Sequence, residues 1–330
     1  MATTGNRACT LDRVTAFVLP LLQQHTQHQQ QLESDEPRRP FFLAISGIQG
    51  SGKSTLASAL RDALAHTSHP GRPHVACVSI DDFYLKKDDL DALSRACPGN
   101  RLVSVRGPPG THDVQLAART MEALAESSTS WPGEASRAMP KYDKGAFGGR
   151  GDRRPSTEWD PITAPVDVVI LEGWCLGFQP LSAGELETAI AEATRAHAAG
   201  PPSCRGRPGP AALQQHASEH LRSMNHALAG YSRDGGGVTA FTEKVNWDAF
   251  VHLDTDDLQN VYTWRWEQEV KLRATTGNGM AEEEVQRFID NYMPAYYLYI
   301  DRLRRGVVPR GRQLRLVLDS HRTITEVEVI

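Results

Sequence analysis

The sequence predicts an α/β fold of three layers, with helices on both faces of a mostly parallel five-stranded sheet. The first observation is a set of five apolar runs, typical of buried strands, at 41–46, 74–80, 166–174, 248–254 and 313–319. The second is apolar residues at helical spacing in most of the intervals, around 112–126, 181–198, 256–274 and 281–305. Strands that alternate with helices form parallel βαβ units, so helices should cover both sides of the sheet.

The chain of 330 residues is long enough for about two domains, at roughly 150 residues each. The strand-like runs extend from residue 41 to residue 319, however, and the motifs described below draw on both halves of that span. We therefore predict an N-terminal helix and polar linker over 1–40 and a single domain over 41–330. Two segments rich in small residues, 127–138 and 196–212, are predicted to be inserts in that domain.

The N-terminal segment has a weaker pattern than the rest. Residues 11–22 carry apolar side chains at helical spacing, but Pro20 interrupts them. The Gln-rich residues 23–40 are predicted to form a linker or an extension of the helix. No basic region followed by an apolar stretch opens the chain, so we do not expect a secretory signal.

Composition limits the partners of the protein. A net charge of -4 argues against binding nucleic acid through a broad basic face, and no apolar run is long enough to predict a membrane span. The five cysteines are spread out without a CxxC pair, which favours a reducing compartment and gives no sign of a zinc cluster. We expect a cytosolic protein, with the nucleus left open, and a small-molecule partner.

A phosphate-binding motif follows the first predicted strand. The residues from 47 to 54, GIQGSGKS, match the pattern GxxxxGK[ST] between a strand and a helix, which is typical of a P-loop. Glycines let successive N–H groups converge on phosphate oxygens, Lys53 would reach the β- and γ-phosphates, and the Ser54 hydroxyl would bind Mg²⁺. The predicted nucleotide-binding residues are Gly47, Ile48, Gln49, Gly50, Ser51, Gly52, Lys53, Ser54 and Thr55. The alternative, a chance match in a flexible loop, has a probability of about 1% at average residue frequencies.

Carboxylates end the second and third predicted strands. The carboxyl ends of strands in an open α/β sheet line its ligand crevice, so Asp81 is predicted to accept the proton of an attacking hydroxyl. Asp82 is the less favoured choice, since adjacent side chains point in different directions, and a helix cap is the structural alternative. Glu172 is predicted to act in catalysis and to hold Mg²⁺ together with Ser54, through water, with a solvent-facing carboxylate as the alternative.

Five motifs in order resemble a known family. The P-loop followed by S-x-D-x-F-Y at 79–84 is similar to the uridine kinase, pantothenate kinase and phosphoribulokinase group. Three further segments, 100–113, 139–153 and 169–178, and the aromatic-rich stretch from residue 262 to 299 resemble the plant-type D-glycerate 3-kinases and their fungal relatives. The resemblance runs from about residue 40 to the C-terminus, except for the two inserts. It implies an ATP- and Mg²⁺-dependent kinase with a helical lid, which would convert D-glycerate to 3-phosphoglycerate.

A small anionic acceptor needs cationic donors, and the resemblance implies where they lie. Arg106 precedes a stiff Gly-Pro-Pro-Gly turn, after which Thr111 could cap the next helix. In related kinases the segment P-x-Y-D lines the acceptor pocket, which implicates Tyr142 and Asp143; Lys144 follows them. The predicted acceptor-binding residues are Tyr84, Arg106, His112, Asp113, Tyr142 and Lys144. Arg150 and Arg153 are on the same loop, for which a solvated basic surface is the competing interpretation.

Three cations on the late helix, Arg265, Lys271 and Arg273, are predicted lid residues. One of them would stabilise charge on the transferring phosphoryl group, unless the helix merely has a charged outer face. Other functions stay open at this stage. The same fold could phosphorylate a nucleoside, pantothenate or another sugar acid, or it could bind ATP as a non-catalytic regulator. The sequence H-x-x-E-H at 216–220 could also hold zinc, but no third ligand is obvious.

Overall fold

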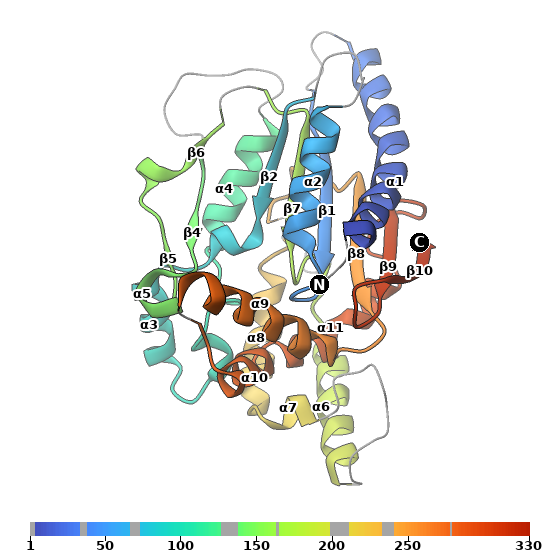
Figure 1. Cartoon of the computed structure of the whole chain (residues 1–330). Helices are drawn as coiled ribbons and strands as arrows, with labels where there is room; N and C mark the ends of the chain where they lie inside the picture. Colours follow the sequence, from blue (N-terminus) through green and yellow to red (C-terminus); the bar gives the residue numbers. More distant parts are fainter. Residues whose placement is uncertain are drawn as a thin grey trace.

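A computed structural model describes residues 4–33, 38–66, 73–126, 138–162, 165–198, 211–232, 241–277 and 279–330. Its centre is a six-stranded sheet in the order β10-β9-β8-β1-β7-β2 (Figure 1). The strands are β1 (Phe41–Gly47), β2 (Val75–Ser79), β7 (Val168–Gly173), β8 (Ala249–Thr255), β9 (Gln313–Leu318) and β10 (Ile324–Val329). All neighbours pair in parallel except β9 and β10, so the predicted mostly parallel α/β fold is confirmed.

Helices lie on both faces of this sheet. Successive side chains of β8 point to opposite faces of the sheet. Asp254 binds Arg304 of α11 on one face, and Leu253 on the other face lines a cavity beside α1 and α2. The helices are α1 (Thr4–Gln31), α2 (Lys53–Ala65), α3 (Lys87–Ala96), α4 (Val114–Ala125), α6 (Ala183–Ala198), α7 (Ala211–Gln214), α8 (Ser218–Ala229), α9 (Asn260–Thr276), α10 (Glu282–Asp290) and α11 (Met293–Arg304). None of the described helices combines the length and the apolar character needed to cross a bilayer.

The sixth strand corrects the prediction of five. β10 follows β9 after a turn of only a few residues, in which the Arg322 N–H donates to the Asp319 carbonyl at 2.8 Å. Strands joined by so short a turn must pair antiparallel. Glu326 and Glu328 alternate with Val327 and Val329 and every one of these side chains is exposed, so this edge strand lacks the continuous apolar character of the buried ones.

The N-terminal helix differs from the expected pattern. α1 runs through Pro20 without ending, although a proline inside a helix removes one backbone hydrogen bond at a cost of about 3 kcal/mol. Val14, Val18 and Leu22 are buried on both sides of it, so tertiary packing outweighs that cost. The Gln-rich stretch is a helix extension as far as Gln31, after which the chain leads to β1.

The stretch predicted as one helix at 281–305 is two helices, α10 and α11, because the chain breaks at Asn291 and Tyr292 just before Pro294, which suits the first turn of a helix.

The inserts predicted at 127–138 and 196–212 fall almost wholly outside the described residues. Between α4 and β7 the chain forms two small antiparallel pairs, β3 (Ala138–Met139) with β6 (Asp160–Pro161) and β4 (Tyr142–Asp143) with β5 (Asp152–Arg153).

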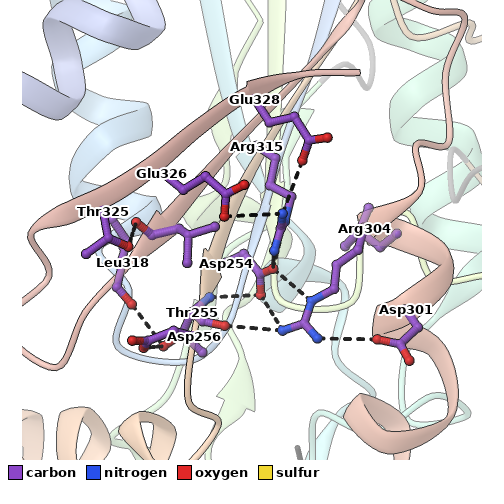
Figure 2. A network of polar contacts seen from close by, with 12 residues as sticks. Asp254, Thr255, Asp256, Asp301, Arg304, Arg315, Leu318, Thr325, Glu326 and Glu328 are labelled. Atoms are coloured by element: carbon purple, nitrogen blue, oxygen red, sulfur yellow. Dashed lines mark hydrogen bonds and ion pairs between the residues drawn. The ribbon is translucent and has the colours of Figure 1, made fainter. Parts of the chain in front are cut away.

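An ion-pair cluster ties the sheet to α11 (Figure 2). The fully buried Asp254 accepts hydrogen bonds from Arg304 at 2.8 Å and from Arg315 of β9 at 2.9 Å. Burial by itself raises the pKa of Asp254, but His252 and Arg304 outweigh it and lower the pKa to about 2. The carboxylate is therefore ionised at neutral pH, and it balances two guanidinium groups that are themselves mostly buried.

Replacing Asp254 with Asn should lower the free energy of unfolding by about 3 kcal/mol at pH 7, because two arginines lose a buried counter-charge. Urea unfolding would measure the change, and Glu328→Gln, at the exposed end of the cluster, should cost under about 1 kcal/mol. The folded-state pKa lies below the unfolded value of 3.8, so this stabilisation is present above that value and is lost as the pH falls towards 2. If the difference in the free energy of unfolding between wild type and variant stayed constant from pH 5 to about pH 2, this account would be contradicted.

Candidate active site

The phosphate-binding loop connects the buried strand β1 to α2. Gly50 and Gly52 have left-handed backbone angles, with φ of 80° and 98°. At Gly50 there is a second constraint, because a Cβ would lie 2.4 Å from the Cβ of Trp264 on α9. Only glycine fits there. Helix α9 thus packs directly on the loop, and Figure 1 shows it crossing near the end of β1.

Arg322 supports the same loop, and the sequence analysis did not single it out. Its Nε donates to the Gly50 carbonyl oxygen at 2.8 Å, and its guanidinium lies 4.9 Å above the ring of Trp264. It also pairs with Glu267 of α9 at 2.8 Å. A positive φ of 63° at this non-glycine residue is a signal that only the structure provides.

Lys53 and Ser54 begin α2 beside the carboxylate of Glu172. Nζ of Lys53 donates to the Ile48 carbonyl at 3.1 Å, and Oγ of Ser54 donates to Glu172 at 2.8 Å. Burial lowers the pKa of Lys53, while the charges of Glu172 and Asp81 act in the opposite direction. Ser79, at the end of β2, donates to the same oxygen of Glu172 at 2.9 Å. Two hydroxyls and a buried carboxylate thus form a group of oxygen ligands next to the loop.

Asp81 lies opposite this group. Its carboxylate accepts a hydrogen bond from the Tyr84 hydroxyl at 2.6 Å and pairs with Nζ of Lys144 at 2.5 Å. Burial raises the pKa of Asp81, but Lys144 and the hydrogen bond from Tyr84 outweigh burial and lower the pKa to about 2. Asp82 faces away and accepts from the Tyr142 N–H at 3.1 Å, and burial raises its pKa to about 6.

These groups surround a cavity of about 150 Å³. Seven of the residues predicted for catalysis, phosphate or metal binding and the acceptor meet there: Lys53, Ser54, Asp81, Tyr84, Arg106, Lys144 and Glu172. Arg265 of the predicted lid also lines it, together with Gln49 and Gly50 of the loop. The sequence analysis missed four of its lining residues, which are Trp174, Gln268, Phe288 and Tyr292. Trp174, Phe288 and Tyr292 lie in the segments 169–178 and 262–299 that carry the family resemblance, but the resemblance gave these side chains no role in the site.

Three predicted acceptor-binding residues lie outside the lining of this cavity. His112 bonds the Tyr231 hydroxyl at 2.5 Å, and burial lowers its pKa to about 4, so its ring is neutral. Asp113 caps α4 by accepting from the Leu116 N–H at 2.9 Å. Tyr142 packs edge-on against Tyr84, with ring centres 5.2 Å apart. His112 and Tyr142 both pack against Tyr84 and so support the cavity wall from behind.

Other predictions for this region are corrected by the structure. Thr111 was expected to cap the helix, but its hydroxyl bonds within the Gly-Pro-Pro-Gly turn, to the Pro108 carbonyl at 2.8 Å, and Asp113 is the cap. Asp143 points at Arg154, 3.4 Å away, and not into the cavity. Arg153 is buried against Asp113 at 3.0 Å, which makes it structural and not a solvated cation.

Arg106 organises the loop that carries Lys144. Its guanidinium donates to the carbonyl oxygens of Gly149 at 2.7 Å and Arg150 at 2.5 Å, and more weakly to that of Lys144 at 3.4 Å. The loop needs such support, because Phe147 inside α5 (Ala146–Gly149) has a left-handed φ of 51°. The backbone carbonyl oxygen of Arg106 accepts a hydrogen bond from the Tyr292 hydroxyl at 2.7 Å. Arg106 therefore connects the Lys144 loop to the start of α11.

The three predicted lid cations do not lie together. Arg265 lines the cavity, pairs with the buried Glu269 and lies 5.4 Å from the ring centre of Phe288. Lys271 lines a separate cavity on the other side of Gly50. Arg273 lines neither of these two cavities. The helical period explains the position of Lys271, because a residue six positions after Arg265 is turned by about 120° from it; Arg273, eight positions after Arg265, is about 12 Å farther along the axis of α9.

The zinc hypothesis receives no support from the structure. His216 lies before α8 and not on it, so the two histidines are not on one helix face. His220 contacts Glu219 at 3.7 Å, and His216 is buried. Within the described part of the chain, no group of three or more His, Cys, Asp or Glu side chains could hold a metal ion.

Comparison with known proteins gives relatives that match most of this chain. No family model matches the chain. The uncharacterized kinase mug58 of Schizosaccharomyces pombe is 35% identical over 285 residues, which cover 86% of this chain and 90% of that protein. The chloroplastic D-glycerate 3-kinase of Arabidopsis thaliana is 31% identical over 84% of this chain, which matches about half of that longer protein (51%). A solved structure of D-glycerate 3-kinase from Cryptococcus neoformans superposes with a TM-score of 0.78 at 33% identity, covering 97% of this chain and 99% of that one.

Proposed function

Because this chain belongs to the D-glycerate 3-kinase family of ATP-dependent P-loop kinases, we propose that it transfers the γ-phosphate of ATP to a hydroxyl of D-glycerate, giving 3-phosphoglycerate. The observation that carries the proposal is the cavity of about 150 Å³ in which the Asp81 carboxylate and the cations Lys53 and Lys144 meet. A pocket of this size is small beside the roughly 300–1,000 Å³ of sites for larger ligands, and it favours a three-carbon acid over a nucleoside or pantothenate.

Asp81 is the proposed acceptor of the hydroxyl proton. Its low pKa keeps it ionised, so it can take a hydrogen bond from the acceptor hydroxyl and orient it. Phosphoryl transfer passes through a loose transition state in which the nucleophile forms little bond early, and a weakly basic carboxylate is sufficient for that. Tyr84, which donates to the other carboxylate oxygen, would hold the side chain in one orientation.

The negative charges of the two substrates need cations on both sides of the cavity. Lys53 would contact the transferring phosphoryl group, as its place after the glycine loop suggests. The ammonium of Lys144 has three donors, so it can keep its contact with Asp81 and also bind the acceptor carboxylate. Arg265 of α9 is the proposed lid cation, since it alone of the three lid residues lines this cavity.

Ser54 and Glu172 fit a Mg²⁺ site. Hydroxyl and carboxylate oxygens are the ligands that this ion prefers, and the hydrogen bond of 2.8 Å between the two side chains brings them together beside Lys53. When bound, the ion would neutralise charge on the phosphate oxygens. Ser79 would keep the Glu172 carboxylate oriented.

A panel of acceptors tests the proposal. Release of ADP in a coupled assay should be fast with D-glycerate and should stay near the water background with uridine and pantothenate. Phosphorus NMR of the product would show which hydroxyl carries the phosphate. Release of ADP with another sugar acid but not with D-glycerate would reject D-glycerate as the acceptor, while the proposed kinase activity would stand.

Replacing Arg106 with Lys should raise the KM for the acceptor by about tenfold, because a single ammonium cannot hold three carbonyl groups of the Lys144 loop. The KM for ATP should not change, since the loop lies on the acceptor side. Steady-state kinetics with each substrate varied in turn would measure both constants. Arg154→Lys, at an exposed position of the same region, is the matched control and should behave as wild type; equal effects of the two variants would contradict the role of Arg106.

A further inference from the structure

Gln49 is the third residue of the phosphate-binding loop, and it lies on the acceptor side of that loop. It lines the cavity of about 150 Å³, which we call the acceptor cavity, but not the separate cavity that Lys271 lines. Lys53 and Asp81 line the acceptor cavity as well. Gln49 is therefore next to the reacting groups, although the sequence analysis predicted only a contact with the nucleotide for it.

Tyr296 of α11 fixes the orientation of the Gln49 amide. The backbone N–H of Gln49 donates to the Tyr296 hydroxyl at 3.3 Å, and the hydroxyl in turn donates its proton to Oε1 of Gln49. Burial raises the pKa of Tyr296 well above its ordinary value, so the hydroxyl keeps this proton at neutral pH. Because the amide oxygen accepts from Tyr296, the NH2 group at Nε2 is the part of the amide left for another partner.

The Tyr296 ring is itself held firmly in place. It is fully buried, and its centre lies 5.4 Å from that of Trp174 and 6.1 Å from that of Phe178, both in edge-on contacts. Trp174 comes two residues after Glu172 of β7, and its Nε1 donates to the Gly107 carbonyl at 3.2 Å. The end of β7 and α11 together therefore set the direction of the amide.

The NH2 group of Gln49 is a buried donor. Its Nε2 makes no hydrogen bond with any residue that the structure describes. Buried donors without a partner are few in folded proteins, because each one loses its hydrogen bonds to water without a replacement. An amide NH2 can only donate, so the missing partner has to supply an oxygen, and the acceptor cavity is the space that this residue lines.

We propose that the side-chain amide of Gln49 donates a hydrogen bond to the carboxylate of the acceptor and that Tyr296 positions the amide for this contact. The inference rests on the proposed function, since it takes the acceptor to be a carboxylic acid, and it names a residue that selects the acid. Phosphate oxygens are the competing partner, but the backbone N–H of Gln49 already bonds Tyr296, so this residue is turned towards α11. Tyr292, four residues earlier, holds Arg106, so α11 supports both sides of the acceptor cavity.

A second donor explains how the acceptor carboxylate is oriented. Lys144 keeps its contact with Asp81 and binds one carboxylate oxygen of the acceptor. A carboxylate has two oxygens, each of which accepts hydrogen bonds, so Gln49 binds the other oxygen from the side of the loop. Two contacts from different sides fix which hydroxyl of the acceptor faces Asp81.

Gln49→Glu tests the donor directly. The variant keeps the size of the side chain and still presents an oxygen to the Tyr296 hydroxyl, but a carboxylate oxygen replaces the NH2 group. It should lower kcat/KM for D-glycerate by at least about a hundredfold, and it should lower kcat/KM much less for D-glyceramide, whose amide can donate to the new carboxylate. Coupled release of ADP measures both constants. Their ratio comes from one enzyme sample, so a partial loss of folded protein cancels.

Two further variants separate positioning from charge. Tyr296→Phe removes the hydroxyl that orients the amide, so it should raise the KM for D-glycerate by about fivefold and leave the KM for ATP as in wild type. Gln259→Glu adds the same charge at an exposed position before α9 that does not line the acceptor cavity, and it should leave the ratio of the two acceptors unchanged.

Two results would overturn the inference. In the first, Gln49→Glu keeps the wild-type ratio of the two acceptors, which would mean that the amide contacts no acceptor carboxylate. In the second, Gln49→Met, which has neither the donor nor a charge, weakens ATP binding in calorimetry as much as it raises the KM for D-glycerate, which would assign the amide to the phosphates. If the wild type uses another sugar acid, D-glycerate fails as the acceptor, but the same comparison of that acid with its amide still tests Gln49. A wild type that phosphorylates no carboxylic acid would overturn both proposals.

Discussion

Replacing Asp81 with Asn should lower kcat for phosphoryl transfer by about a thousandfold while leaving the affinity for ATP nearly unchanged. The amide keeps the size of the side chain but cannot take a proton, and it also removes the charge that Lys144 faces at 2.5 Å. Single-turnover transfer of the γ-phosphate would measure the chemical step, and binding of ATP by calorimetry would measure the affinity. Full turnover by the variant would remove Asp81 from the mechanism.

The neighbouring carboxylate provides a matched control. Asp82→Asn makes the same chemical change one residue away, but Asp82 accepts a hydrogen bond from the Tyr142 N–H and does not line the acceptor cavity. An asparagine oxygen can accept the same hydrogen bond, so this variant should keep most of the activity. If Asp82→Asn were the inactive variant of the two, the roles assigned to the pair would have to be exchanged.

Replacing Lys53 with Ala should abolish measurable transfer, a loss of at least about a thousandfold, because the site loses its donor to the transferring phosphate. Unlike Asp81→Asn, this variant should also bind ATP more weakly, since the lysine is expected to contact the phosphates before reaction. The fold should not suffer, because burial already lowers the pKa of Lys53 and its removal relieves a desolvated charge. The coupled assay and calorimetry would measure activity and affinity.

Lys141→Ala is the control for general effects of losing a lysine. This side chain pairs with Asp160 at the surface, 2.6 Å away, and is not among the residues that line the acceptor cavity. It should retain wild-type kinetics, as most exposed ion pairs contribute little. Lys53→Ala with turnover comparable to this control would refute the proposed role of the loop lysine.

The sequence predicted those parts of the fold that are encoded by local patterns. Continuous apolar runs identified the five parallel strands because a strand buried on both faces tolerates few polar residues. The glycine spacing identified the phosphate-binding loop, because glycines supply the left-handed backbone angles that this loop requires. β10 was missed because an exposed edge strand has no such run. Whether α1 continues through Pro20 was left open, because its packing on the core cannot be read from its own residues.

Residues that meet through the fold were predicted less well. Asp81, Glu172 and Lys144 were singled out, each from its own motif, and the structure brings them to one cavity. Arg322 was missed, since it lies in an ordinary turn more than 250 positions from the loop that it supports. Asp143 and Asp113 have acidic side chains next to the right motifs, but one faces a surface arginine and the other caps a helix.

The sequence by itself determined the type of chemistry, because a glycine loop with Lys53 and Ser54 can bind phosphates wherever the fold places it. The tertiary structure decided which cations line which cavity. Lys144, Arg265 and Lys271 are equally charged in the sequence, but the fold directs the first two towards the cavity that Asp81 lines and the third towards the cavity beyond Gly50. The physical reason is that helix phase and loop support set the direction of a side chain, and both depend on residues far away in the chain.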